Sequence, residues 1–299
     1  MELNNNFLIL YSQQLDLAFQ GYGIDYLAIA NVLQNISPDQ IERFSKAFYC
    51  YSQQSLSNYL KQRCGGKGQN LMQYCIQDRY TLWATLIKKS IKGLGTDEKM
   101  LTELLILASE EDMVLIQEKY FEIYDKEMLE DISSDFSKNA MLKFLKAWVY
   151  AMRYPKQYII EEVELLKTTL AAKSVDQQII IKFLTTITPE QFREINDLYL
   201  QNAKQTIKQA MIKAFTGKIQ YAIVMGVEFL ISGTQACAFA FSKSLKSKEQ
   251  SILCITALLR DRYRSQFSQI YSQVAGKTLE EDLKIGFEDI SDTIITLWN

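Results

Sequence analysis

The sequence predicts an all-α protein built from four copies of one helical repeat, and two observations support this prediction. First, residues of the buried type return at successive spacings of 72, 79 and 72 residues. The aromatic members of this series are Phe48, Tyr120, Tyr199 and Tyr271. The aliphatic members, in the preceding segment, are Ile29, Leu101, Ile180 and Ile252. Second, no stretch alternates polar and apolar residues between turn signals, so we expect no sheet.

Each copy consists of several short segments with helical character. In the first copy, residues 27–33 are apolar at a spacing near 3.6, which predicts a deeply buried helix. A capping segment follows, in which Ser37 precedes a proline, as Thr188 does in the third copy. This order is typical of an N-cap followed by proline in the first helical turn. The second copy has Ser109 and Asp112 in the same segment.

The last segment of each copy is also helical and strongly apolar, as residues 139–150 and 219–230 illustrate. The apolar stretch 222–241 approaches the length of a membrane span. It is interrupted by Glu228 and Ser232, and the repeat spacing places a break between two helices near Ser232. We therefore expect two packed helices there and no transmembrane segment.

The spacings also predict the domain boundaries. The linker between the second and third copies is longer than the others by about seven residues, the difference between the spacings of 79 and 72. The predicted segments are an N-terminal extension over 1–10 and repeats over 11–80, 81–153, 154–231 and 232–299.

The composition limits the classes of function. Of 299 residues, 48% are hydrophobic and 23% are charged, as in soluble globular proteins. The net charge of −2 provides no general basic field for nucleic acid. Histidine is absent, which removes the usual general base and zinc ligand, and no phosphate-binding loop or nucleophile motif occurs. We expect a binding protein and no enzyme. Five scattered cysteines indicate reduced thiols in the cytoplasm.

The second copy contains an unusual glycine turn just before its buried helix. Gly93 and Gly95 flank a single residue, so the backbone can turn tightly and direct its carbonyl oxygens inward. Thr96 is a suitable N-cap for the next helix, and Asp97 and Glu98 complement the helix dipole in its first turn. Taken alone, the motif is also consistent with an ordinary, well-capped interhelical turn.

A carboxylate in the same copy adds to this turn. Asp135 follows Gly93 by 42 residues, at the loop before the last helix of the repeat. Carbonyl oxygens from one loop and a carboxylate from another form a set of hard oxygen ligands suited to calcium. Water or a phosphate group from another molecule would fill the remaining positions.

These residues resemble a known family. Residues 92–98, Lys-Gly-Leu-Gly-Thr-Asp-Glu, match the annexin signature K-G-x-G-T-D-E, and Asp135 falls where annexins have their distal acidic ligand. The long central linker is also an annexin trait, and the resemblance extends from about residue 10 to 298. Within this superfamily the chain is most similar to the alpha-giardins, annexin-like proteins of a protozoan cytoskeleton. The resemblance implies four repeats of about five helices each, arranged as a curved disc that binds Ca²⁺ and phospholipid.

The resemblance also implies a ligand set. The carbonyl groups of Ile91, Gly93 and Gly95, with the carboxylate of Asp135, would form the main calcium site. By the same resemblance, Thr96 and Glu98 would form a weaker accessory site.

The other copies depart from this pattern. The first copy keeps two glycines, but Arg63 replaces the distal carboxylate and would repel a cation. The third copy has Ala214 and the fourth has Gly286 at that position, although Glu288 and Asp289 follow closely in the fourth. We therefore expect one intact calcium site in four repeats, which weakens any avidity for membranes.

Lysines occupy the predicted loops: Lys92, Lys173, Lys243, Lys246 and Lys248. They are either ordinary solubilising charges or direct contacts to anionic lipid head groups.

Together these features predict a calcium-dependent, phospholipid-binding protein of annexin type. It would lie at the inner face of the plasma membrane, bind acidic phospholipid and link the membrane to the cytoskeleton. The alternative is a scaffold on microtubules or other filaments for which calcium is largely dispensable.

Overall fold

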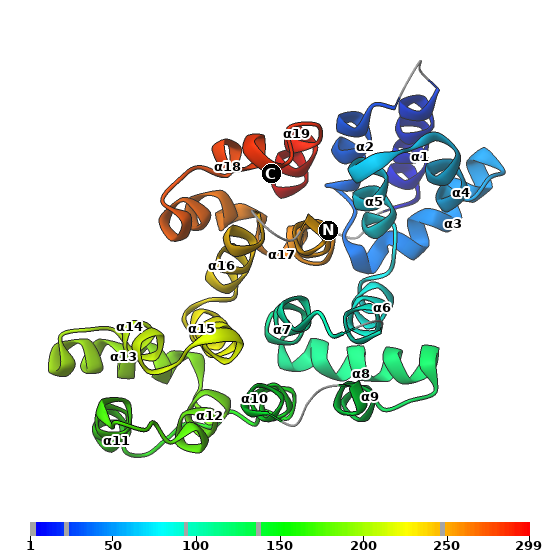
Figure 1. The fold of residues 1–299 in the computed structure, drawn as a ribbon. Helices are drawn as coiled ribbons and strands as arrows, with labels where there is room; N and C mark the ends of the chain where they lie inside the picture. The colour runs from blue at the N-terminus through cyan, green and yellow to red at the C-terminus, as the bar shows by residue number, and fades with distance from the viewer. Residues whose placement is uncertain (1–3, 21–23, 93–94, 136–138, 246–248) are drawn as a thin grey trace. The chain divides into compact units, whose positions relative to one another are not determined.

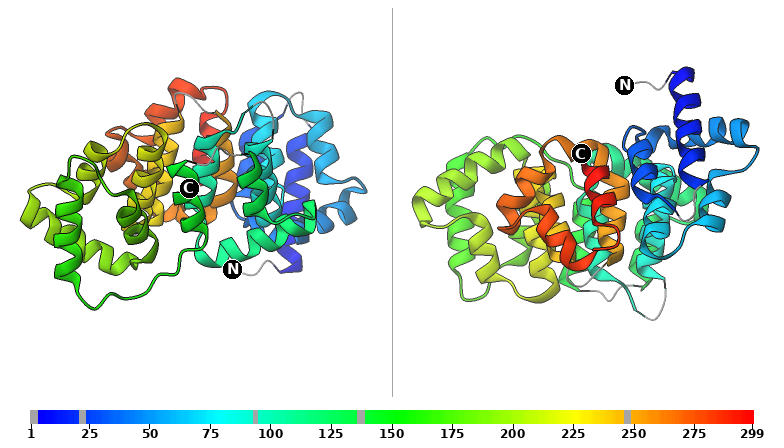
Figure 2. Two further views of the ribbon diagram at one scale, coloured as in Figure 1. Left: turned by 60° about the horizontal axis from the view of Figure 1, so that its bottom comes forward. Right: turned by 90° about the horizontal axis from the view of Figure 1, so that it is seen from above.

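The computed structural model describes residues 4–20, 24–92, 95–135, 139–245 and 249–299. Every regular segment in these residues is a helix and none is a strand, which confirms the all-α prediction (Figures 1 and 2). The first repeat contains α1 (Asn5–Phe19), α2 (Tyr26–Leu33), the 3-10 helix η1 (Pro38–Gln40), α3 (Ile41–Ser52), α4 (Leu56–Arg63) and α5 (Gly66–Cys75). The second contains α6 (Arg79–Ile91), α7 (Glu98–Ile106), α8 (Glu110–Tyr124), α9 (Met128–Asp135) and α10 (Ala140–Val149).

The second half of the chain continues the pattern. The third repeat contains α11 (Ile159–Ala171), α12 (Gln177–Thr186), α13 (Pro189–Ala203), α14 (Ile207–Ala214) and α15 (Gly217–Ile231). The fourth contains α16 (Gly233–Ser244), α17 (Glu249–Ala275), α18 (Leu279–Gly286) and α19 (Ser291–Trp298). The first three repeats thus have the expected five α-helices, whereas the fourth has four in the described residues.

Burial confirms the repeat spacing. The four aromatic marker residues and the four aliphatic ones are all at most 2% exposed. All eight lie in helices at equivalent places in their repeats, so one set of side chains fills the interior four times.

The helix starts follow the capping residues in the second and third repeats. Ser109 and Asp112 form a reciprocal capping box at the start of α8, with N–O distances of 3.1 and 3.0 Å. The hydroxyl of Thr188 accepts a hydrogen bond from the backbone N–H of Gln191 in the first turn of α13. In the first repeat, the side chain of Ser37 makes no capping hydrogen bond, and the first turn is the 3-10 helix η1.

In the fourth repeat, no break separates the two helices that correspond to α12 and α13 of the third repeat. Arg260 stands at the position that Ser37, Ser109 and Thr188 occupy in the other copies, because it follows Thr188 by 72 residues. Its buried guanidinium donates to the carbonyl groups of Ala257 and Ile36 and offers no acceptor for a helix start. Two predicted helices are consequently joined in α17, which is 27 residues long.

Two further boundaries bear on the sequence predictions. Helix α1 begins at Asn5 with Asn4 as its N-cap, so helical structure begins inside the segment 1–10 expected as an extension. Helix α15 ends at Ile231, and α16 begins at Gly233, which confirms the break predicted at Ser232. No helix in the described residues is long and apolar enough to cross a membrane.

The chain forms two compact units. One comprises residues 1–83 and 241–299, and the other comprises residues 84–240. The first unit therefore combines most of repeats one and four, and within it α19 packs against α2 and α17. The second combines most of repeats two and three, and within it α15 packs against α7 and α10.

Candidate metal centre

The glycine turn of the second repeat joins α6 to α7. Ile91 ends α6 with its side chain buried, and the backbone N–H of Asp97 donates to the carbonyl of Ser90 at 2.7 Å. Gly95 has φ +104°, a conformation that favours glycine, although a Cβ there would meet no atom within 4 Å. The backbone conformation at position 95 therefore favours glycine, as the sequence predicted. Gly93 lies outside the described residues.

The start of α7 differs from the prediction by one residue. The N-cap is Asp97, whose carboxylate accepts from the backbone N–H of Met100 at 3.2 Å, and the expectation of Thr96 as the cap is wrong. A carboxylate one residue nearer the helix satisfies the free N–H group and also complements the positive end of the helix dipole.

Asp135 is the last residue of α9, and its side chain lies outside the described residues. The next helix, α10, begins at Ala140 with Asn139 as its N-cap. Asp135 therefore ends α9, immediately before the connection to α10, and does not lie in the loop where the sequence analysis expected it. The ligand set of Ile91, Gly93, Gly95 and Asp135 remains a prediction.

A buried ion pair connects the two helices that end at this site. Lys88 of α6 donates to the carboxylate of Asp131 of α9 at 2.5 Å, and the hydroxyl of Tyr120 donates to the same oxygen at 2.5 Å. Lys88 lies three residues before Ile91, and Asp131 lies four residues before Asp135. The pair thus links α6 and α9 about one helical turn before the two parts of the predicted ligand set.

The electrostatics of Asp131 favour its charged form. Burial raises its pKa, but the hydrogen bonds from Lys88 and Tyr120 and the nearby charge of Lys126 outweigh that effect, so the pKa lies below its ordinary value. The sequence reasoning did not identify this residue. A signal was present, because the same spacing of 11 residues separates Tyr271 from Asp282, which form a hydrogen bond of 2.8 Å in the fourth repeat.

The predicted accessory ligand Glu98 already faces a cation. Its side chain is 17% exposed and forms an ion pair with the ammonium group of Lys218, at the start of α15. Metal binding by Thr96 and Glu98 remains a prediction. The carboxylate of Glu98 is only partly exposed to solvent.

In the first repeat, an arginine stands at the distal position. The guanidinium of Arg63 donates to the carbonyl of Phe19 at 3.4 Å. Phe19 corresponds to Ile91 and Arg63 corresponds to Asp135, each 72 residues earlier. In the first repeat, the guanidinium at the distal position therefore reaches the carbonyl that corresponds to that of Ile91.

The fourth repeat shows the same proximity. A Cβ added at Gly286 would lie 3.3 Å from the carbonyl oxygen of Leu245, so this distal position also abuts its loop. Among the described residues, no group of three or more cysteine and acidic side chains is arranged to hold a metal ion.

Comparison with known proteins accounts for this arrangement. Residues 83–143 match the annexin family model. The chain is 22% identical to "Annexin E1" of Giardia intestinalis over 285 residues, an alignment that covers 91% of this chain and 84% of the relative. The solved structure of calcium-bound alpha-14 giardin covers 99% of this chain and 98% of its own, with a TM-score of 0.85 and 20% identity. That of calcium-bound alpha-1 giardin covers 97% and 98%, with a TM-score of 0.87 and 19% identity. The chain has the annexin fold.

The annexin family match coincides with the candidate centre. Residues 83–143 contain the glycine turn, Asp135 and the ion pair between Lys88 and Asp131. The resemblance to annexins and alpha-giardins, deduced from this motif, is confirmed.

The lysines predicted as lipid contacts are partly described. Lys92, Lys173 and Lys243 are exposed, but Lys243 lies in the last turn of α16 and not in a loop as expected. Lys246 and Lys248 lie outside the described residues. Lys92 follows the last residue of α6, beside the candidate centre.

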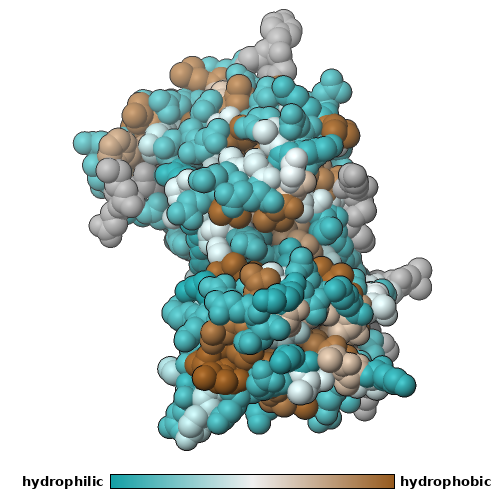
Figure 3. Space-filling view, turned by 90° about the vertical axis from the view of Figure 1, so that its left-hand side faces the viewer, coloured by the Kyte–Doolittle hydropathy of each residue, from teal (hydrophilic) through white to brown (hydrophobic). Residues whose placement is uncertain are grey.

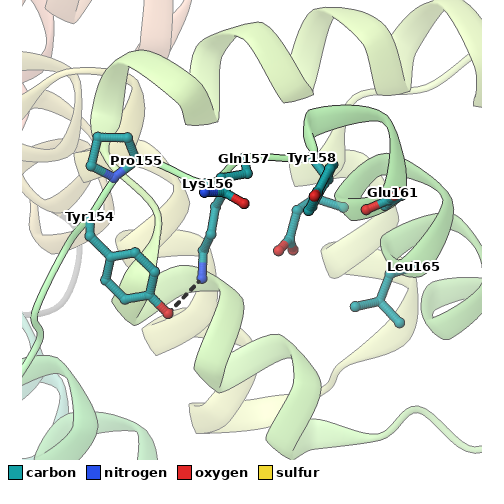
Figure 4. A pocket seen from close by; sticks show the side chains of 8 residues that line it. Tyr154, Pro155, Lys156, Gln157, Tyr158, Glu161 and Leu165 are labelled. Carbon is teal, nitrogen blue, oxygen red and sulfur yellow. Dashed lines mark hydrogen bonds between the residues drawn. The ribbon is translucent and has the colours of Figure 1, made fainter.

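The long linker of this annexin-like chain forms a second surface feature. A shallow pocket is lined by Tyr154, Lys156, Tyr158 and neighbouring residues, and the ammonium group of Lys156 donates to the hydroxyl of Tyr154 at 3.2 Å (Figure 4). The backbone of Lys156 is anchored by two hydrogen bonds to the side chain of Gln191. Apolar residues also form separate patches among hydrophilic ones on the face shown in Figure 3. These features show no cluster of metal ligands in the described residues.

Proposed function

We propose that the chain is a calcium-dependent, phospholipid-binding peripheral membrane protein of annexin type, and that it acts by binding and not by catalysis. The observation that carries this proposal is the second repeat. There the annexin family match covers both parts of the ligand set, and the ion pair between Lys88 and Asp131 connects the two helices that end in them.

The proposed ion is calcium. The carbonyl oxygens of Ile91, Gly93 and Gly95 and the carboxylate of Asp135 would supply the protein ligands. Calcium takes six to eight oxygen ligands, so positions remain for water and for the phosphate of a lipid head group. Two solved structures with this fold, of alpha-14 and alpha-1 giardin, are described as calcium-bound, which supports this choice of ion.

The expected binding is weak in the absence of lipid. One carboxylate gives the site a low ligand charge, and dissociation constants on the order of 10⁻⁴ to 10⁻³ M are typical of such low-affinity modules. Acidic lipid would strengthen it, because the five lysines predicted as lipid contacts would add about 1 kcal/mol each where they reach the membrane surface. We place the protein at the cytoplasmic face of the plasma membrane, linking it to the cytoskeleton.

A cytoskeletal scaffold is the second candidate. The observation that favours it is the contact between Arg63 and the carbonyl of Phe19. In the first repeat, a protein cation and not a metal ion would then bind this carbonyl. In this alternative the fold would bind microtubules or other filaments, and calcium would be largely dispensable.

Sedimentation with phosphatidylserine vesicles separates the two candidates. We expect the wild-type protein to pellet with vesicles in millimolar calcium and to remain soluble in chelator. Asp135→Ala should abolish this difference, whereas Glu130→Ala, at an exposed carboxylate on the same helix, should preserve it. Equal pelleting of wild type and Asp135→Ala in chelator, together with co-sedimentation with microtubules, would replace the first candidate by the second.

A further inference from the structure

Two lysines occupy equivalent positions in different repeats. Lys67 is the second residue of α5, and Lys218 is the second residue of α15, each in the last helix of its repeat. Each follows a glycine with positive φ, +62° at Gly66 and +65° at Gly217. The lysines are 151 residues apart, the sum of the first two repeat spacings. The same helix start therefore presents the same ammonium group in the first and third repeats.

Both lysines are directed at equivalent carboxylates. Lys218 forms an ion pair with Glu98, the first residue of α7. Lys67 lies 3.8 Å from the carboxylate of Glu249, the first residue of α17. Glu98 and Glu249 are also 151 residues apart. Each compact unit thus contains one such pair, in which one repeat provides the lysine and the other provides the glutamate.

The surroundings of Lys67 show how such an ammonium group is held. It donates to the carbonyl of Gly286 at 3.2 Å and lies 3.9 Å from the carboxylate of Asp289. It also lies 5.1 Å from the ring centroid of Phe287. Three oxygen groups of the fourth repeat therefore surround one positive charge.

We propose that Lys218 is the resident cation of Glu98 and excludes a divalent metal ion from it. An ammonium group and a calcium ion cannot share one carboxylate without strong repulsion. The side chain of Glu98 is 17% exposed, so it has little open surface on which to accept a second cation. Lys218 thereby limits the second repeat to the metal ion of the main site and leaves the position of Thr96 and Glu98 without metal.

The consequence is that Lys218 determines how many metal ions the second repeat takes. The Lys218 side chain is 73% exposed, so it can be replaced without opening the core. Once it is removed, the Glu98 carboxylate loses this cation and becomes available to another one. This inference rests on the proposed calcium-dependent function, because it names the residue that controls a second position next to the main site.

Terbium titration without lipid tests the inference, with Tb³⁺ as the probe and every variant built on Asp135→Ala. In this background the main site is disabled, so the two proposals are measured separately. We expect Lys218→Gln to bind one more equivalent of Tb³⁺ than its parent, with about tenfold tighter half-saturation for that position, because a nearby positive charge is removed. Adding Glu98→Gln should abolish the gain, and Lys218→Arg should show none, because it keeps the charge.

Lys213→Gln is the matched control. Lys213 is an exposed lysine on the neighbouring helix α14 whose ammonium group contacts the amide oxygen of Gln205, so its removal changes the net charge equally. The control should bind no additional ion. The inference is wrong if Lys218→Gln gains no ion, if its gain persists with Glu98→Gln, or if the parent already binds an ion that Glu98→Gln removes. Failure of the proposed function would appear elsewhere, as equal binding by wild type and Asp135→Ala.

Discussion

Asp131 is a buried charge next to the candidate metal centre that contributes to the stability of the fold. Its carboxylate accepts from Lys88 and Tyr120, which together hold its pKa below the ordinary value despite burial. A depressed pKa means that the charged form contributes stability above the unfolded pKa of about 3.9. That contribution is lost as the pH falls through the lower, folded pKa.

The first prediction follows from this environment. Asp131→Asn should lower the free energy of unfolding at pH 7 by about 1–3 kcal/mol, because the partly buried Lys88 ammonium loses its charged acceptor. The difference from wild type should begin to shrink near pH 4, where the unfolded carboxylate takes up a proton, and it should be lost as the pH falls through the lower, folded pKa. Urea unfolding over this pH range measures both effects. Glu130→Gln, at an exposed neighbour, should show little change, and a loss for Asp131→Asn that is independent of pH would contradict the argument.

The second prediction concerns the distal position of the first repeat. Arg63 contacts the carbonyl of Phe19 there, and the loop keeps two glycines in its sequence. Arg63→Asp should restore a carboxylate next to the loop and add calcium-dependent binding to phosphatidylserine vesicles, measured as a lower calcium concentration for half-maximal sedimentation. Arg63→Gln removes the positive charge without supplying a ligand and should leave this midpoint nearly unchanged. An equal shift in both variants would show that charge alone is responsible.

At the scale of the helices, the sequence predicted the starts that polar side chains cap. Ser109 and Thr188 both make the expected hydrogen bonds to the first turns of α8 and α13. The uninterrupted α17 was not predicted, although Arg260 offers no acceptor for a helix start at this position. Local signals also failed at Ser37, which makes no capping hydrogen bond, and at Thr96, because the N-cap of α7 is Asp97.

The third prediction compares two serines at one repeat position. Ser109→Ala should destabilise the protein by about 1 kcal/mol, because it removes the cap of α8. Ser37→Ala should have a much smaller effect, because the side chain of Ser37 makes no capping hydrogen bond. Chemical denaturation of both variants under the same conditions measures the contrast. Equal destabilisation would mean that the hydroxyl at this position acts in some other way.

At the scale of the whole molecule, the repeat spacing predicted the fold because burial follows it. The same side chains are needed in the interior of every copy, so their periodicity is visible in one sequence. The grouping of repeats one and four, and of two and three, was not visible, because it depends on contacts between distant segments. The ion pair between Lys88 and Asp131, which spans 43 residues, escaped the sequence reasoning for the same reason.

The glycine turn and the distal aspartate were found from sequence because their spacing matches a family signature. Their partners were not, since a lysine such as Lys218 has the composition of an ordinary surface residue until the structure places Glu98 beside it. The sequence therefore allowed a ligand set to be proposed, but it did not indicate the charges that surround the candidate centre.

Diffraction from crystals soaked in millimolar calcium tests the central claim most directly. We predict one calcium ion in the second repeat, bound by the carbonyl groups of Ile91, Gly93 and Gly95 and by the carboxylate of Asp135. An empty site in the second repeat, with calcium bound at the loops of other repeats, would contradict the account.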